Sequence, residues 1–281
     1  MNGSGTSAGL GLLAAATWGG SDFVGGLGSR RAPAMLVVAS GHVFSFLLLV
    51  CVCLGAHLIP PGRHDLMLAA IAGFEGSLAL AIFYHALAMS AMGLTAALTG
   101  LLTALVPVLF SFFLDGLPGP MTAAGLLAGL GAIWLITHTP SRGGPGTPPT
   151  ALLLGALAGT GFGIQLILFK MASGGGLMWT MTAARAAGSL AMLLVILVRP
   201  PKRPWKGFWQ LGVLAGMLDT MGNLFYIRAT QLGRLDIAAV VCSLYPAGTI
   251  LLAALVLREL PTRRQLAGMA LALGAVMLLS A

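Results

Sequence analysis

The sequence predicts an all-α integral membrane protein with ten transmembrane helices arranged as two inverted five-helix repeats. Three observations predict this class: only 8% of the 281 residues are charged, 58% are hydrophobic, and apolar runs recur along the whole chain. In soluble domains roughly a quarter of all residues are charged, and disordered chains are poor in apolar residues. The composition therefore excludes both a soluble globular protein and a disordered one.

The length of the chain sets the number of helices. A transmembrane helix needs roughly 20 apolar residues, so ten helices use about 200 and leave about 80 for loops and tails. No segment is long enough for a soluble domain. Residues 1–7 lack the basic region and cleavage site of a signal peptide, so the first apolar run is expected to stay as a helix. The predicted helices are 8–28, 33–56, 66–88, 94–114, 120–138, 150–171, 177–198, 207–230, 236–257 and 263–280.

The chain divides into two similar halves. The longest polar gap, the predicted linker 139–149, separates a first repeat, 8–138, from a second, 150–280. Trp18-Gly19 corresponds to Phe162-Gly163, and Phe83-Tyr84 to Phe225-Tyr226. An odd number of helices per repeat inserts the second copy upside down, and inverted repeats are typical of secondary transporters.

The basic residues predict the orientation. Four Lys and Arg fall in one set of alternate loops and ten in the other, namely Arg30, Arg31, Arg142, Arg199, Lys202, Arg203, Lys206, Arg258, Arg263 and Arg264. The positive-inside rule places the ten in the cytoplasm and both termini on the non-cytoplasmic side. The net charge of +8 is thus interpreted as a topology signal, and no nucleic-acid partner is expected.

Two motifs resemble a known family. Thr17-Trp18-Gly19-Gly20-Ser21-Asp22-Phe23 is similar to the first-helix motif of EamA-type transporters in the drug/metabolite transporter superfamily. Ser243-Leu244-Tyr245-Pro246, followed by Arg258-Glu259-Leu260 and Gln265-Leu266-Ala267-Gly268, resembles the end of an EamA repeat. The first repeat departs from the pattern, with Asp115-Gly116 where the family reads Gly-Glu. The resemblance implies two inverted halves around a central cavity and the transport of small metabolites or drugs.

Ionisable residues inside a membrane helix are costly, about 2.5–3.5 kcal/mol on insertion scales, and so mark candidate sites. Asp219, Asn223 and Tyr226 share one helix face at i, i+4 and i+7. This face is a candidate substrate or proton site, and the alternative is a buried hydrogen-bond network between helices. Tyr84, the counterpart of Tyr226, joins the candidate substrate-binding residues.

Three further acidic or aromatic candidates lie in the first repeat. Trp18 and Asp22 share a face four residues apart and would suit an amino group or organic cation. Alternatively, Trp18 only packs, and Asp22 reaches the basic turn at Arg30. Glu75 is a candidate for proton coupling, although the repeat alignment places it about 160° from the face of Asp219, towards a neighbouring helix.

Arg185 is the basic residue well inside a predicted helix. It could bind an anionic group of the substrate or pair with one of the acidic residues. His42 and His85 are expected to be packed or hydrogen-bonded, with His85 also a candidate proton relay. Pro107 and Pro246 are expected to kink or break the fourth and ninth helices.

These features favour a carrier over other function classes. The sequence has no paired-His zinc motif and no Gly-x-Ser-x-Gly nucleophile motif, so neither an enzyme nor a metal or cofactor is expected. A channel filter sequence is also absent. We expect an alternating-access transporter of small metabolites such as amino acids in a bacterial inner membrane, either proton-coupled or facilitative. An exporter of drugs or organic cations is the alternative, and the chain is expected to be a monomer or homodimer.

Overall fold

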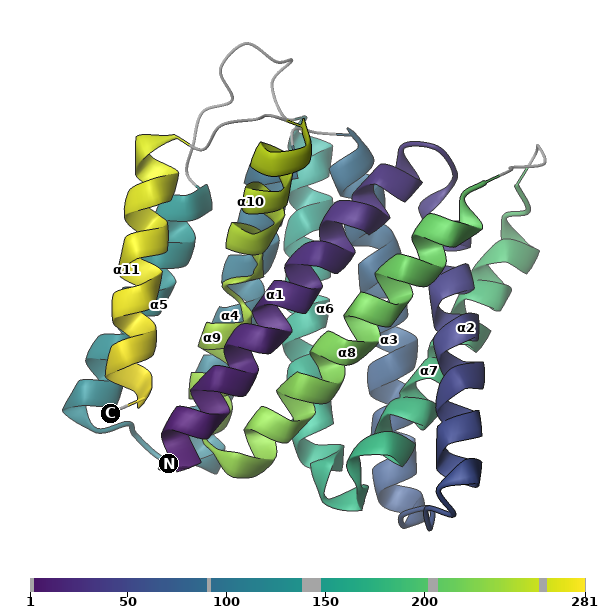
Figure 1. Ribbon diagram of the computed structural model, residues 1–281, viewed down its shortest axis with the longest axis horizontal. Coiled ribbons are helices and arrows are strands. Elements are labelled where there is room, and N and C mark those ends of the chain that lie inside the picture. The colour runs from purple at the N-terminus through teal and green to yellow at the C-terminus, as the bar shows by residue number, and fades with distance from the viewer. Residues whose placement is uncertain (1–2, 90–91, 138–147, 202–206, 258–261, 281) are drawn as a thin grey trace.

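The computed structural model describes residues 3–89, 92–137, 148–201, 207–257 and 262–280. In these ranges the regular secondary structure is all helical, with short connections between the helices, and both termini lie at the same end of the helical bundle (Figure 1). The helices are α1 (Gly3–Ser29), α2 (Ala34–Gly55), α3 (Arg63–Met89), α4 (Met92–Leu114), α5 (Pro120–Thr137), α6 (Pro149–Ala172), the short 3-10 helix η1 (Ser173–Gly175), α7 (Leu177–Val198), α8 (Trp209–Leu232), α9 (Leu235–Cys242), α10 (Tyr245–Leu257) and α11 (Arg263–Ser280).

The predicted ten-helix count is confirmed when α9 and α10 are taken as one interrupted span. The interruption falls at Ser243 and Leu244, and α10 begins with Tyr245 and Pro246. Proline cannot donate to the carbonyl four residues earlier and clashes with it, so a helix ends there and a new one starts. In contrast, α4 continues through Pro107 without a break.

Part of the sequence prediction falls outside the described residues. This applies to residues 139–147 of the predicted linker, to Glu259 of the EamA-like motif, and to half of the basic residues used for orientation: Arg142, Lys202, Arg203, Lys206 and Arg258.

The helices of the two halves pack mainly on one another. In the first half, α1 lies against α8 and α10, α2 against α7 and α8, and α3 against α6 and α7. α4 packs on α6 and α9, and α5 packs on α11 at one edge of the bundle (Figure 1). Both halves therefore contribute to the centre of the molecule.

Glycines allow the closest of these crossings. A Cβ atom on Gly41 of α2 would lie 2.6 Å from the carbonyl oxygen of Gly212 and 2.8 Å from the Cα of Gly216, both on α8. Only a residue without a side chain lets the two backbones approach this closely. This crossing brings the middle of α2 against the part of α8 that carries Asp219.

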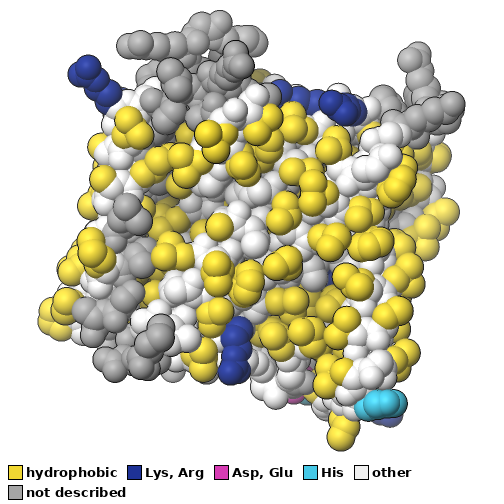
Figure 2. Space-filling view, viewed as in Figure 1, with side chains coloured by type: hydrophobic (Ala, Val, Ile, Leu, Met, Phe, Trp, Pro, Cys, Tyr) yellow, Lys and Arg dark blue, Asp and Glu magenta, His cyan; other side chains and the backbone are white. Residues whose placement is uncertain are grey.

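The outer surface fits a lipid environment. Large apolar side chains such as Leu47, Ile71, Leu157 and Leu193 are each more than half exposed. Figure 2 shows one face on which apolar side chains cover the middle of the bundle, while Lys, Arg and His side chains lie near its two ends. Five described segments are long and apolar enough on their own to cross a membrane, so the protein is a multi-pass membrane protein: Ala34–Gly55, Arg63–Met89, Pro149–Ala172, Leu177–Val198 and Leu235–Leu252.

Candidate functional site

A small cavity lies in the centre of the bundle. Its volume is about 40 Å³, enough for roughly three water molecules. Its lining comes from seven helices of both halves: Trp18 and Asp22 of α1, His42 of α2, Gly76 and Leu80 of α3, Thr103 of α4, Phe162, Gln165 and Leu166 of α6, Asp219 and Asn223 of α8, and Tyr245 of α10. The cavity therefore combines carboxylates, amides and aromatic rings within an apolar bundle.

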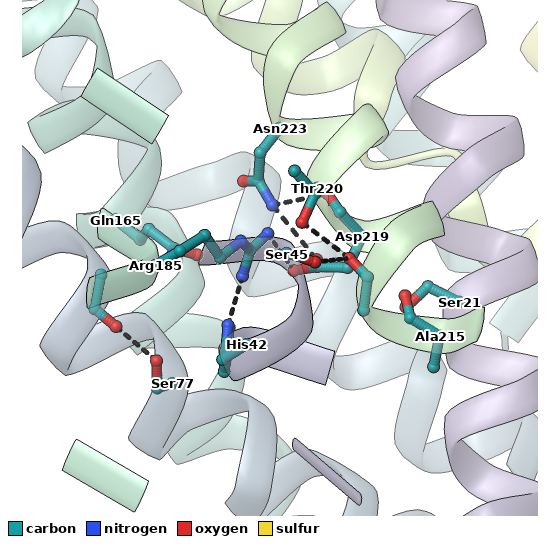
Figure 3. A network of polar contacts seen from close by, with 12 residues as sticks. Ser21, His42, Ser45, Ser77, Gln165, Arg185, Ala215, Asp219, Thr220 and Asn223 are labelled. Atoms are coloured by element: carbon teal, nitrogen blue, oxygen red, sulfur yellow. Dashed lines mark hydrogen bonds and ion pairs between the residues drawn. The ribbon is translucent and has the colours of Figure 1, made fainter. Parts of the chain in front are cut away.

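Arg185 of α7 lies between two of these helices. Its Nη2 atom donates to Asp219 Oδ2 over 2.5 Å, and its Nη1 atom donates to His42 Nδ1 over 2.6 Å (Figure 3). The side chain of Arg185 is only 3% exposed. Pairing of Arg185 with an acid, one of the two alternatives from the sequence, is thus found in the structure.

The three residues of the predicted α8 face, Asp219, Asn223 and Tyr226, do not all line the cavity. Asn223 donates from Nδ2 to the carbonyl oxygen of Asp219 over 2.8 Å and to its carboxylate over 3.2 Å, so these two residues act together in the cavity wall. Tyr226, one turn further, is fully buried and donates its hydroxyl to the carbonyl of Leu166 on α6 over 2.9 Å. Tyr226 thus joins two helices, and the cavity lining does not include it.

Asp22 faces the cavity beside aromatic rings. It is 6% exposed, and among the described residues no basic side chain forms an ion pair with it. Trp18 lies one turn away on α1, with its ring centroid 6.5 Å from that of Tyr245 in an edge-on arrangement. Arg30, which the sequence offered as an alternative partner for Asp22, is exposed at the end of α1.

The remaining sequence candidates lie outside the cavity lining. Tyr84 is buried, with its hydroxyl 3.0 Å from Ser21 Oγ. The carboxylate of Glu75 turns towards α6, where a Cβ atom on Gly161 would lie 2.6 Å from its Oε1. His85 is exposed on α3. The structure therefore brings together Trp18, Asp22, Asp219 and Asn223 with the nearby Arg185. The other four candidates, Tyr84, Tyr226, Glu75 and His85, lie outside the lining of the central cavity.

Sequence reasoning did not place four of the lining residues in the site: His42, Thr103, Gln165 and Tyr245. It did predict His42 to be packed or hydrogen-bonded, and the contact with Arg185 confirms this. The other three are polar or aromatic residues in apolar runs, and no local spacing connects them to Asp219. For His42 a signal was present, because a histidine inside a membrane helix is itself unusual. The described residues contain no cluster of three or more His, Cys, Asp and Glu that could hold a metal ion.

A second polar cluster lies at the end of the bundle that holds both termini (Figure 1). Arg234 donates over 2.9 Å to the carbonyl oxygens of Asp115 and Gly116, which connect α4 to α5, and also to the carboxylate of Asp236. The hydrogen bond with Asp236 raises the pKa of Arg234 above its ordinary value, so the guanidinium stays charged. Asp236 itself is fully buried. This cluster, Arg234 with Asp115, Gly116 and Asp236, ties the two halves together at that end.

Comparisons with known proteins agree with this architecture. A solved structure titled "Crystal structure of protein" superposes with a TM-score of 0.73 at 20% sequence identity, covering 97% of this chain and 95% of that chain. At this identity the likeness shows the fold alone. No curated protein matches the chain significantly. The model of the EamA-like transporter family matches residues 149–281. The second half of this membrane protein is therefore similar to the EamA-like transporter family.

Proposed function

We propose that this protein is an alternating-access secondary transporter for small organic molecules that carry a positively charged amine. One observation supports this most strongly. The central cavity contains two carboxylates, Asp22 and Asp219, and only Asp219 has a basic partner among the described residues. With His42 neutral and both carboxylates ionised, the group of Asp22, Asp219 and Arg185 would carry one excess negative charge, which a cationic ligand or a proton on Asp22 would neutralise.

The arrangement of the helices supports an inverted-repeat mechanism. α1 packs on α8 as α6 packs on α3, and α2 packs on α8 as α7 packs on α3. The pairs α2 with α7 and α5 with α11 each join corresponding helices of the two halves. This is the exchange pattern expected when one half repeats the other around a two-fold axis in the membrane plane. Rocking of the two halves about that axis would expose the cavity to each side in turn.

The size of the cavity favours a closed conformation in this structure. Room for about three water molecules is too little for a metabolite, whose binding sites usually span about 300–1,000 Å³. Binding of a substrate would therefore require the helices around Trp18 and Asn223 to move apart. The polar cluster at Arg234 closes the end with both termini, so opening on that side would require it to separate.

Five of the sequence candidates have a role in this proposal. Asp22 would bind the amine beside Trp18, and Asn223 would add a polar contact through its carbonyl oxygen. Asp219 and Arg185 would hold each other until substrate or a proton competes for one of them. For proton coupling, Asp22 and Asp219 are better positioned than Glu75 and His85, which do not line the cavity.

Two substrate classes remain in competition, and a specific observation separates them. An amino acid would require a partner for its carboxylate, and both Nη atoms of Arg185 already donate to protein groups. This favours an organic cation without a carboxylate, which corresponds to an exporter of drugs or cations. An amino acid remains the metabolite candidate if Arg185 releases Asp219 during the cycle.

Thermal-shift binding to the purified protein in detergent tests these alternatives. The probes are amino acids, the amines that remain after removal of their carboxyl groups, and uncharged nucleosides. We expect stabilisation by amines, loss of that stabilisation in Asp22→Asn, and retention in the control Asp65→Asn at the start of α3. Stabilisation by nucleosides alone would contradict the proposed substrate class, and an unchanged response in Asp22→Asn would contradict the role of that carboxylate.

A further inference from the structure

The contact of His42 with the Arg185–Asp219 ion pair restricts the protonation state of the histidine ring. The 2.6 Å contact joins His42 Nδ1 to Arg185 Nη1. A guanidinium nitrogen can only donate, so His42 Nδ1 must accept, and the ring must be neutral with its hydrogen on Nε2. The contact therefore assigns both the protonation state and the tautomer of a histidine within the bundle.

A proton on Nδ1 would remove this contact. The ring would then have donors on both nitrogens, and a second positive charge would face Arg185 at hydrogen-bond distance. His42 is 4% exposed, so little solvent would screen the repulsion. Neutral His42 thus supports the position of Arg185 on Asp219, whereas protonated His42 would displace the arginine.

A second, smaller cavity borders the same side chain. It has a volume of about 10 Å³ and lies between α2, α3 and α8, and its lining includes His42, Asp219 and Tyr84. His42, Leu80 and Asp219 line both cavities and therefore lie between them. The other residues of the smaller cavity, among them Val37, Val38 and Gly212, lie near the end of the bundle opposite the termini. His42 Nε2 is buried and has no hydrogen-bond partner among the described residues, so no described protein acceptor holds its hydrogen or the orientation of the ring.

We propose that His42 is a proton-binding residue that controls the Arg185–Asp219 pair of this transporter. A proton from hydronium binds Nδ1 and leaves water, while the hydrogen on Nε2 stays, and Arg185 moves away from Asp219. The charged groups facing His42 are Arg185 of α7, Asp219 of α8 and Asp22 of α1, with the neutral hydroxyl of Tyr84 on α3. The two carboxylates stabilise the protonated ring once Arg185 has moved, which links proton binding to the conformational change. This inference rests on the proposed transport function.

The first test observes the histidine directly and needs no substrate. The full chain carries ¹⁵N-labelled histidine in lipid nanodiscs, and His42 is assigned as the signal lost in His42→Asn. We expect a neutral ring with its hydrogen on Nε2 at neutral pH, and conversion to the doubly protonated ring on acidification. A neutral ring throughout the range in which the protein stays folded, or a hydrogen on Nδ1 at neutral pH, would overturn the proposal.

The second test follows the cavity by fluorescence. Trp18 becomes the sole tryptophan when the other four, Trp134, Trp179, Trp205 and Trp209, are replaced by phenylalanine. We expect acidification to change its emission in the otherwise native chain and in the control His85→Asn. The response should be lost in His42→Asn, whose side-chain oxygen can still accept from Arg185 but cannot bind a proton. An equal response in His42→Asn would assign the titration to another group.

The third test separates this inference from transport itself. Transport of an amine that stabilises the protein is measured in proteoliposomes at several pH values for the native chain, His42→Asn and His85→Asn. The proposal predicts that His85→Asn keeps the native pH profile of transport and that His42→Asn changes it. Transport with the native profile in His42→Asn refutes the proposal. If no amine is transported but His42 titrates with a Trp18 response, the transport function fails and the proton-binding site stands.

Discussion

Arg185 on α7 and Asp219 on α8 form an ion pair with an N–O distance of 2.5 Å, although 34 residues separate them in the chain. Their side chains are 3% and 14% exposed. Removing one member of such a pair leaves an uncompensated charge in a poorly solvated place. The pair therefore links the stability of the bundle to the electrostatics of the cavity.

Loss of one partner should cost more than loss of both. We predict that Arg185→Met destabilises the protein by about 3–5 kcal/mol, because the carboxylate of Asp219 then lacks its partner. The double variant Arg185→Met/Asp219→Leu should recover most of this loss. Unfolding by SDS titration in mixed micelles measures both. The single variant Asp219→Leu is measured as well. If the double variant loses as much stability as Arg185→Met and Asp219→Leu lose together, the two residues contribute independently.

The crossing of α2 and α8 should not tolerate a methyl group. Gly41→Ala places a Cβ atom 2.6 Å from the carbonyl of Gly212, so we predict destabilisation by about 1–3 kcal/mol. The matched control is Gly9→Ala on α1, where a Cβ atom would have no neighbour within 4 Å. The same SDS titration compares them. Equal stability of the two variants would mean that the helices can separate without cost.

The polar cluster at Arg234 should protect the end of the bundle from opening. Arg234→Lys keeps the charge but loses the planar donor group that reaches Asp115, Gly116 and Asp236 together. We predict that amide hydrogen exchange in the connection between α4 and α5 becomes about tenfold faster or more. The control is Arg228→Lys, an exposed arginine that donates to Gln231. Similar exchange rates in the two variants would argue against a closing role.

The orientation in the membrane can be tested by labelling. Cys51, Cys53 and Cys242 are replaced by alanine, and single cysteines are introduced by Gly62→Cys between α2 and α3 and by Arg31→Cys after α1. Both positions are exposed. A membrane-impermeant maleimide added to intact cells should label the cysteine at position 62 and leave that at position 31 unlabelled until the cells are opened. The reverse pattern would invert the predicted topology.

The helices were largely predictable from the sequence, because apolar runs and their polar breaks are local signals. The contact between Asn223 and Asp219 was also predictable, since residues four apart meet on one helix face. The expected interruption of the ninth span followed from Pro246. Pro107 gave the same local signal but did not interrupt α4, since membrane helices tolerate proline where neighbouring groups satisfy the backbone.

The cavity was only partly predictable, for a physical reason. Asp22 and Asp219 were recognisable because charge is rare and costly in a membrane helix. The contact of Arg185 with His42 joins residues 143 positions apart, and no spacing rule reaches across that distance. The separation of Tyr226 from the cavity depends likewise on where α6 crosses α8, because the carbonyl of Leu166 takes its hydroxyl.

The most direct test of the proposed transport mechanism is counterflow in proteoliposomes. Vesicles preloaded with an unlabelled amine that carries no carboxyl group receive the same compound in radiolabelled form outside. We predict transient accumulation of at least one compound by the native chain and by the control Asp65→Asn, and accumulation reduced about tenfold or more in Asp22→Asn, equivalent to about 1.4 kcal/mol of lost binding. No accumulation of any compound, or equal accumulation in Asp22→Asn, would contradict a transporter whose central cavity binds amines at Asp22.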